Sequence, residues 1–336
     1  MPTPLLDSLR RAGQLYGIAG PTGAGLRDYD DEPSRKAAGQ IGKLQPHAIG
    51  IDASNVAQWM SDRGPDTDIT AILDEPGLQA PWPVSWIEWD WRDDPLMVNS
   101  WPIKKAACLV EGFSGTPSQE RVEELIGRFP EQPIREWATC TQGMTVWGPF
   151  LPWPQEPGAV IGPWGAWAIG LDDEGRPLFY DDQYIEVFGV GQQVTDAMER
   201  NTGKNADQGK LPVQIATLMA LRTFQFANCQ NVDLVEVEPR LSRQQRRLHE
   251  RTGEPVNTWH ELRIGAIGGQ RATGPAGPSQ GLVRQHICRG HFATYTEERK
   301  LFGKYAGRFW IPATVKGNPA RGRADKGYVV EAPDAR

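Results

Sequence analysis

PVQIATLMALRTFQFANC, residues 212–229, is the strongest helix signal in the chain. Proline is favoured at the first position of a helix, because the N–H that it lacks would have no partner there. The apolar residues of this segment are too numerous for a single surface stripe and include Ile215, Leu218, Met219 and Phe226. We therefore predict a helix that is central to the core.

The region upstream of this helix is acidic and rich in tryptophan and proline. The 336 residues include 13 Trp, 28 Pro and 37 Gly, a composition typical of irregular β structure and loops packed by aromatic anchors. The pattern predicts an amphipathic helix over 5–17, a loop or poorly ordered segment over 18–46 and a half-buried strand over 86–91. A hairpin is predicted over 164–180, around an ordinary turn at 172–175.

Downstream of the central helix the pattern changes to one short basic helix and several strands. Ser242 and Gln245 form a capping-box signal, and Gly253 ends the helix that they begin. Strands are expected at 258–264, 282–295, 308–315 and 327–331. We predict an α+β fold in two parts. Residues 1–205 form an acidic, loop-rich, Trp/Pro-rich α+β region, and residues 206–336 form a basic module with a helix pair and a small antiparallel β-meander.

Charge is divided unevenly along the chain. Residues 240–336 contain 18 Lys and Arg against 8 Asp and Glu, a formal charge of +10, whereas the first 239 residues carry −16. Such asymmetry predicts a polyanion-binding C-terminal end. An alternative is that the two halves neutralise each other, or that the acidic half binds a protein partner.

Composition also restricts the cellular compartment in which the protein is expected. The four cysteines are far apart and form no CxxC pair, which is typical of a reducing cytosol. No apolar run approaches the ~18 residues of a membrane span, and the N-terminus has no basic segment followed by an apolar core. We therefore expect a cytoplasmic protein that does not contact a membrane, with no cofactor-binding motif and no metal.

The densest polar constellation is HICRGHFATY, residues 286–295. Metal-independent RNA cleavage needs a base for the 2′-hydroxyl, an acid for the leaving oxygen and a cation for the phosphate. His286 and His291 are the candidate acid and base, Tyr295 the accessory donor and Arg289 the phosphate contact. RNA is favoured over DNA because this chemistry requires the 2′-hydroxyl.

Three alternatives to catalysis stay open for this segment. The two histidines face opposite sides of an unbroken strand, and they share a side only if Gly290 forms a β-bulge. They could instead be structural, or the segment could bind phosphate without catalysis. A zinc site with Cys288 is disfavoured, since it needs further ligands from elsewhere in the chain.

A second basic feature lies on the predicted helix 242–252. Arg243, Arg247 and Arg251 recur every four residues and so share one face, with Arg246 beside them. Such a stripe can contact a phosphate backbone, although a solvated face or pairing with the acidic half explains it equally well. With Arg289, two further cations complete the predicted nucleic-acid-binding set: Lys304 and Arg308.

The C-terminal third resembles a family of uncharacterised proteins of bacterial chromosomes, plasmids and phages. The residues that carry the resemblance are His286-x-x-Arg289-Gly290-His291, Leu301-Phe302-Gly303, Phe309-Trp310-Ile311-Pro312 and Lys316-Gly317. The resemblance implies a phage or mobile-element context and no particular reaction. The leading hypothesis is thus a nucleic-acid-binding protein of a mobile element, in one form an RNA-cleaving toxin. The alternatives are a non-enzymatic interaction protein, such as a host-factor inhibitor or polyanion mimic, and a virion or structural component.

Overall fold

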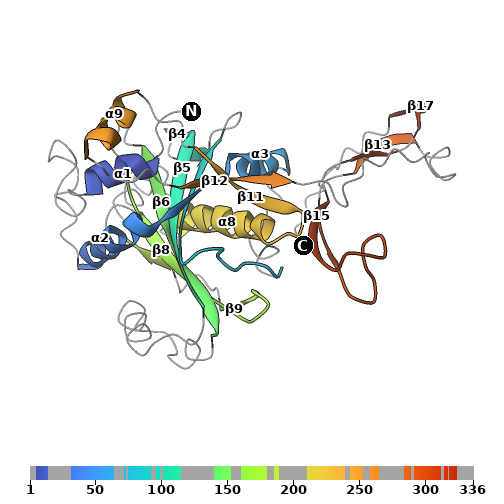
Figure 1. Ribbon diagram of the computed structural model, residues 1–336, viewed down its shortest axis with the longest axis horizontal. Helices are drawn as coiled ribbons and strands as arrows, with labels where there is room; N and C mark the ends of the chain where they lie inside the picture. The colour runs from blue at the N-terminus through green and yellow to red at the C-terminus, as the bar shows by residue number, and fades with distance from the viewer. Residues whose placement is uncertain are drawn as a thin grey trace, which may run out of the picture. The chain divides into compact units, whose positions relative to one another are not determined.

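A computed structural model shows two compact units (Figure 1). The first is formed from Met1–Asn228 and Asp233–Arg263, and the second from Cys229–Val232 and Ile264–Arg336. The residues that the structure describes are 5–13, 32–63, 72, 75–91, 96–98, 101–114, 140–152, 160–179, 185–188, 210–238, 243–252, 258–264, 284–288, 291–311, 314–316 and 318–323.

The first unit is built on a mixed ten-stranded sheet. Eight strands follow one another in the order β10-β8-β6-β5-β2-β1-β12-β11, with β7 beside β6 and β9 beside β8. Strand β1 is parallel to both β2 and β12, whereas β2, β5, β6, β8 and β10 pair antiparallel. The strands are β1 (Ile49–Asp52), β2 (Val84–Asp90), β5 (Lys105–Ser114), β6 (Gln142–Pro152), β7 (Val160–Ile161), β8 (Gly165–Leu171), β9 (Pro177–Phe179), β10 (Ile185–Val187), β11 (Val232–Val237) and β12 (Trp259–Ile264). A separate pair is formed by β3 (Leu96–Val98) and β4 (Trp101–Ile103).

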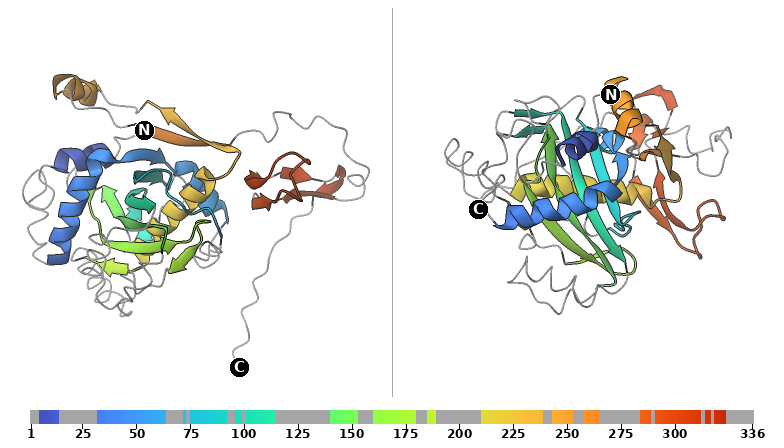
Figure 2. Two further views of the ribbon diagram at one scale, coloured as in Figure 1. Left: turned by 60° about the horizontal axis from the view of Figure 1, so that its bottom comes forward. Right: turned by 60° about the vertical axis from the view of Figure 1, so that its left-hand side comes forward.

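Helices cover both faces of this sheet. Helices α1 (Leu5–Gly13) and α2 (Glu32–Leu44) pack on one face, and α8 (Lys210–Ala227) packs on the other (Figure 2). A 3₁₀ turn (Gln45–His47) leads from α2 into β1, and α3 (Ser54–Arg63) follows β1. None of the helices in the described part of the chain has the length and apolar character needed to span a membrane.

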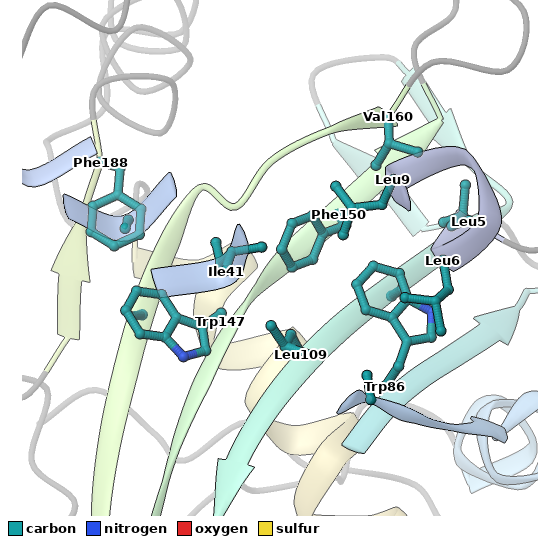
Figure 3. Packing of buried hydrophobic residues seen from close by; sticks show 14 of the residues in the cluster. Leu5, Leu6, Leu9, Ile41, Trp86, Leu109, Trp147, Phe150, Val160 and Phe188 are labelled. Carbon is teal, nitrogen blue, oxygen red and sulfur yellow. The ribbon is translucent and has the colours of Figure 1, made fainter. Parts of the chain in front are cut away.

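The core under α1 and α2 is aromatic (Figure 3). The rings of Trp86 and Phe150 lie 5.0 Å apart and those of Trp147 and Phe188 6.1 Å apart. Leu6 and Leu9 of α1 are completely buried against this layer. Large flat side chains of this kind remove much apolar surface from water per residue, and this explains part of the high tryptophan content.

Helix α8 lies close to its face of the sheet because small residues line the contact. A Cβ placed on Gly148 would meet the Cβ of Ala216 at 3.2 Å, and one on Gly165 would meet Val213 Cγ2 at 2.8 Å. Thirteen residues of α8 are buried, among them Leu221 and Phe224. The prediction of a central core helix is therefore confirmed.

The predicted fold class is wrong in its architecture. The structure has one large mixed sheet with few helices: α8 and α9 form individually, but within the described residues they do not combine with a small meander into the expected C-terminal module. The core helix packs on N-terminal strands, and β12, expected in the meander, pairs in parallel with β1. An apolar helix needs a broad apolar partner, and among the described residues the strands β5, β6 and β8 supply it. The predicted division at residue 205 lies outside the described residues.

Two N-terminal expectations are also corrected. Part of the expected loop 18–46 forms α2, whose Ala37 and Ile41 are buried four residues apart. Strand β2 is not half-buried, since Trp86 and Ile87 on its opposite faces are both fully buried. The expected hairpin around 172–175 is confirmed by the antiparallel pairing of β8 and β9.

The second unit contains short strands in small sheets. β13 (Arg284–Cys288) pairs with β16 (Thr314–Lys316) and β17 (Asn318–Arg323), and β14 (His291–Tyr295) pairs with β15 (Gly307–Ile311). The predicted strand 282–295 is thus two strands in different sheets. The predicted strand 327–331 lies outside the described residues.

Glu88 is one of the charged residues buried in the described part of the first unit, with Asp7 and Arg222. The Glu88 carboxylate accepts hydrogen bonds from the backbone N–H of Leu5 at 2.8 Å and from the Trp86 indole at 3.1 Å, and it contacts the Lys105 ammonium at 2.5 Å. Burial raises the pKa of Glu88 above its ordinary value, and these three donors partly oppose the rise. The carboxylate anchors the N-terminus of α1 to the sheet, where a helix favours negative charge.

Replacing Glu88 with Gln removes the charge that Lys105 contacts inside the core. We expect the free energy of unfolding to fall by roughly 3–5 kcal/mol, as when one partner of a buried pair is removed. Chemical denaturation measures the change. Glu111→Gln is the matched control, since Glu111 accepts a hydrogen bond from Gln40 at a site that is only half-buried. Equal losses in the two variants would contradict a special role for Glu88.

The difference in stability between the wild type and Glu88→Gln should also depend on pH. Because the pKa of Glu88 is raised in the folded state, the folded chain binds more protons than the unfolded chain above the ordinary value of 4.5. The stability advantage of the wild type over Glu88→Gln should therefore shrink as the pH rises from 4.5. An advantage that grows with pH would show that Lys105 outweighs burial.

Candidate nucleic-acid interface

The arginine-rich helix forms as predicted. Helix α9 spans Arg243–Thr252, in agreement with the expected 242–252. Its exposed side chains include all four of its arginines: Arg243, Arg246, Arg247 and Arg251. At 1.5 Å of rise per residue, the row of Arg243, Arg247 and Arg251 extends over about 12 Å of one face. None of the ion pairs within the described part of the chain includes these arginines.

The histidine segment is divided between two sheets. His286 in β13 is paired with Lys316, and His291 in β14 is paired with Ile311. Arg289 and Gly290, where a bulge would place the two histidines on one side, lie outside the described residues, as does the side chain of His286. The catalytic roles of His286 and His291 stay a prediction.

His291 and Tyr295 start and end the same strand. They are four residues apart, so they share a face but stand about 13 Å from each other along β14. His291 is exposed, whereas Tyr295 is half-buried with its ring 6.0 Å from that of Phe309. The strand therefore does not bring these two predicted catalytic side chains into contact.

The hairpin of β14 and β15 carries aromatic side chains on both of its faces. Phe292 lies opposite Trp310 with ring centroids 4.9 Å apart, and the guanidinium of Arg308 lies 4.6 Å from the Phe292 ring. Arg308, predicted to bind nucleic acid, is thus half-buried against its own hairpin, where a cation over an aromatic face is stabilised.

A segment that follows α8 in the chain fixes the outer strand of this hairpin. The buried side chain of Asn231 donates from Nδ2 to the carbonyl of Trp310 at 2.7 Å and accepts the N–H of Trp310 through Oδ1 at 2.8 Å. The N–H of Gln230 donates to the carbonyl of Arg308 at 2.8 Å. One amide side chain thereby takes the place of a neighbouring strand.

The loop from Thr296 to Ala306 carries the remaining predicted cation, Lys304, which is exposed. The Lys300 ammonium pairs with Glu297 at 2.6 Å. The hydroxyl of Thr296 and a backbone N–H lower the pKa of Glu298, which keeps this exposed carboxyl charged. Arg299 is exposed next to them.

Acidic residues also line up in the first unit. Asp52 of β1 is in register with Glu88 of β2 and Glu261 of β12, near the carboxyl ends of three parallel strands. Asp52 accepts the N–H of Ser54 at the start of α3, and Glu88 holds Lys105, so both have structural partners. Within the described ranges, no three His, Cys, Asp or Glu residues are placed to hold a metal ion.

No protein-family model, curated protein or solved structure matches this chain. What the chain does must therefore be inferred from the chemistry of its own side chains. Two parts of the described chain present exposed cations: the arginine row of α9, and the loop between β14 and β15 with Arg299 and Lys304.

Two residues of the second unit have roles that the sequence did not predict. Phe302 is the most exposed of the large apolar side chains in the described residues, and Asn231 is the buried anchor of β15. Gly303 within a polar stretch between two strands is a turn signal. Neither the exposure of Phe302 nor the distant partner of Asn231 has a local signal.

Replacing Asn231 with Ala leaves two backbone groups of Trp310 without their side-chain partners. We expect the hairpin to lose about 1–3 kcal/mol of local stability, with faster hydrogen exchange at β14 and β15 amides. Asn228→Ala is a matched control, because Asn228 donates instead to the carbonyls of Gly77 and Gln79. Its effect should be confined to 77–79. Unchanged exchange at β15 in Asn231→Ala would contradict the anchoring role.

Proposed function

We propose that this chain is a nucleic-acid-binding protein of the cytoplasm, with RNA as the expected ligand. The observation that carries the proposal is the row of exposed arginines on α9, Arg243, Arg247 and Arg251. Guanidinium groups suit phosphates because their planar donors bind two oxygens at once. Arginines spaced four residues apart on a helix present several such groups to one nucleic-acid strand.

Charge supports the same proposal. Helix α9 contains four arginines against one acidic residue, Glu250, which is also exposed. Within the described residues, no carboxylate neutralises the arginines, so the alternative of pairing with the acidic half gains no support. The buried free thiol of Cys108 supports a reducing compartment.

The proposal is restricted to binding. Cleavage would require an acid and a base at one phosphate, and the side chain of His286, the predicted partner of His291, lies outside the described residues. RNA cleavage by this protein stays a hypothesis. It is tested by asking whether the RNA is still intact after incubation with the protein.

A triple substitution of Arg243, Arg247 and Arg251 with Gln tests the arginine row. Each phosphate contact contributes about 0.7 to the slope of log affinity against log salt for a single strand. We expect the slope for a labelled single-stranded RNA to fall by about 2, with weaker binding between about 50 and 200 mM salt. Fluorescence anisotropy measures both quantities.

A second triple variant with the same change in net charge is the control. Lys43, Arg176 and Arg263 are exposed cations of the first unit outside α9, and their replacement with Gln should leave the slope nearly unchanged. Equal effects of the two triples would mean that overall charge, not α9, attracts RNA. Absence of RNA binding by the wild type at low salt would refute the proposed function.

A further inference from the structure

The loop between β14 and β15 contains a tight turn, in which a phenylalanine has a left-handed backbone conformation. The carbonyl of Leu301 accepts the N–H groups of Lys304 and Tyr305, both at 3.1 Å, and the N–H of Leu301 donates to the carbonyl of Tyr305 at 2.8 Å. Between them, Phe302 and Gly303 have φ values of 52° and 69°. Two successive left-handed residues define a type I′ turn.

Phenylalanine is a poor choice for this position if folding alone matters. Left-handed backbone crowds any Cβ, and Asn, Asp or Gly is preferred at the first central residue of this turn. Phe302 is 72% exposed, so burial of its ring does not offset that cost. Phe302 is also the one non-glycine residue of the described chain with positive φ. A strained, exposed aromatic residue at the end of a loop suggests a ligand.

The surroundings of Phe302 indicate the chemistry of that ligand. The loop projects beyond both strands (Figure 1), and a Cβ on the neighbouring Gly303 would meet nothing within 4 Å. Lys304 beside it is exposed, and the Tyr305 ring is 39% exposed with its centroid 6.4 Å from Phe309. Exposed aromatic faces next to a cation are what unpaired bases and their phosphates require.

We propose that Phe302 is a stacking platform for an unpaired nucleobase, with Lys304 contacting the adjacent phosphate. This inference rests on the proposed binding of nucleic acid and adds a substrate class, since only single-stranded or flipped-out bases expose the face that stacks. Aromatic stacking tolerates any base, so the loop adds affinity for single strands without reading sequence.

The test compares Phe302→Asn with the wild type. The probe is a labelled single-stranded oligoadenylate of about ten nucleotides, within the range that such sites cover. Loss of a stacked base is expected to weaken binding by roughly 5- to 150-fold. The salt slope should not change, because no charge is removed, and the unfolding temperature should stay the same or rise, because Asn accepts the left-handed backbone.

Three controls distinguish base stacking from nonspecific hydrophobic binding. Phe302→Trp should bind as tightly as the wild type, since it keeps an aromatic face. An abasic oligonucleotide of equal length should bind Phe302→Asn and the wild type equally. Leu178→Asn removes a different exposed apolar side chain, 48% exposed on β9, and should leave binding unchanged.

The outcomes also separate this inference from the proposed function. Wild-type affinity in Phe302→Asn, together with a reduced salt slope in the α9 triple variant, would overturn the stacking platform and leave the proposed function standing. Equal losses in Phe302→Asn and Leu178→Asn, or in Phe302→Trp, would likewise overturn it. If the wild type does not bind the oligoadenylate even at low salt, the proposed function fails first and the platform with it.

Discussion

Burial of both faces of the central strands is the constraint on which the first unit depends. Trp86 faces α1 and α2 while Ile87 lies on the opposite face, and neither is accessible to water. Strands buried on both sides need a helix layer on each face. The chain supplies these layers from positions far apart in sequence, with α1 and α2 from its beginning and α8 from beyond residue 209.

This double burial limits where charge can lie. Glu88 is tolerated inside because Lys105, the Trp86 indole and the N-terminus of α1 surround its carboxylate. Arg222, also buried, is held by Gln225 at 2.6 Å and lies over the ring of Trp59. The cations that carry the proposed function are instead exposed, on helix α9. Folding and ligand binding therefore use different residues.

Local patterns predicted some of these elements well. The central helix, the arginine helix and the hairpin around 172–175 were all expected from spacing and turn residues. They succeed because helix periodicity, capping and turn chemistry act within a few residues. Helix α2 was missed because its glycines and its few apolar residues weaken the local signal, although Ala37 and Ile41 are buried at helical spacing.

The candidate site, too, has parts that the sequence predicts and parts that it does not. The arginine row of α9 follows from helix geometry and could be predicted. The assignment of His286 and His291 to strands of different sheets could not, because the end of one strand and the choice of a new partner depend on pairing with Lys316 and Ile311. The exposure of Phe302 depends on the turn that Leu301 and Tyr305 close, and the sequence around it gives no measure of exposure.

The sequence by itself determined the local elements, the division of charge along the chain and the face on which the α9 arginines lie. Only the tertiary structure decided that β12 pairs with β1, that α8 covers N-terminal strands and that Asn231 holds Trp310. Pairings of this kind join residues many positions apart, and their free energy depends on which surfaces remain to be covered once the rest of the chain has packed. No local pattern carries that information.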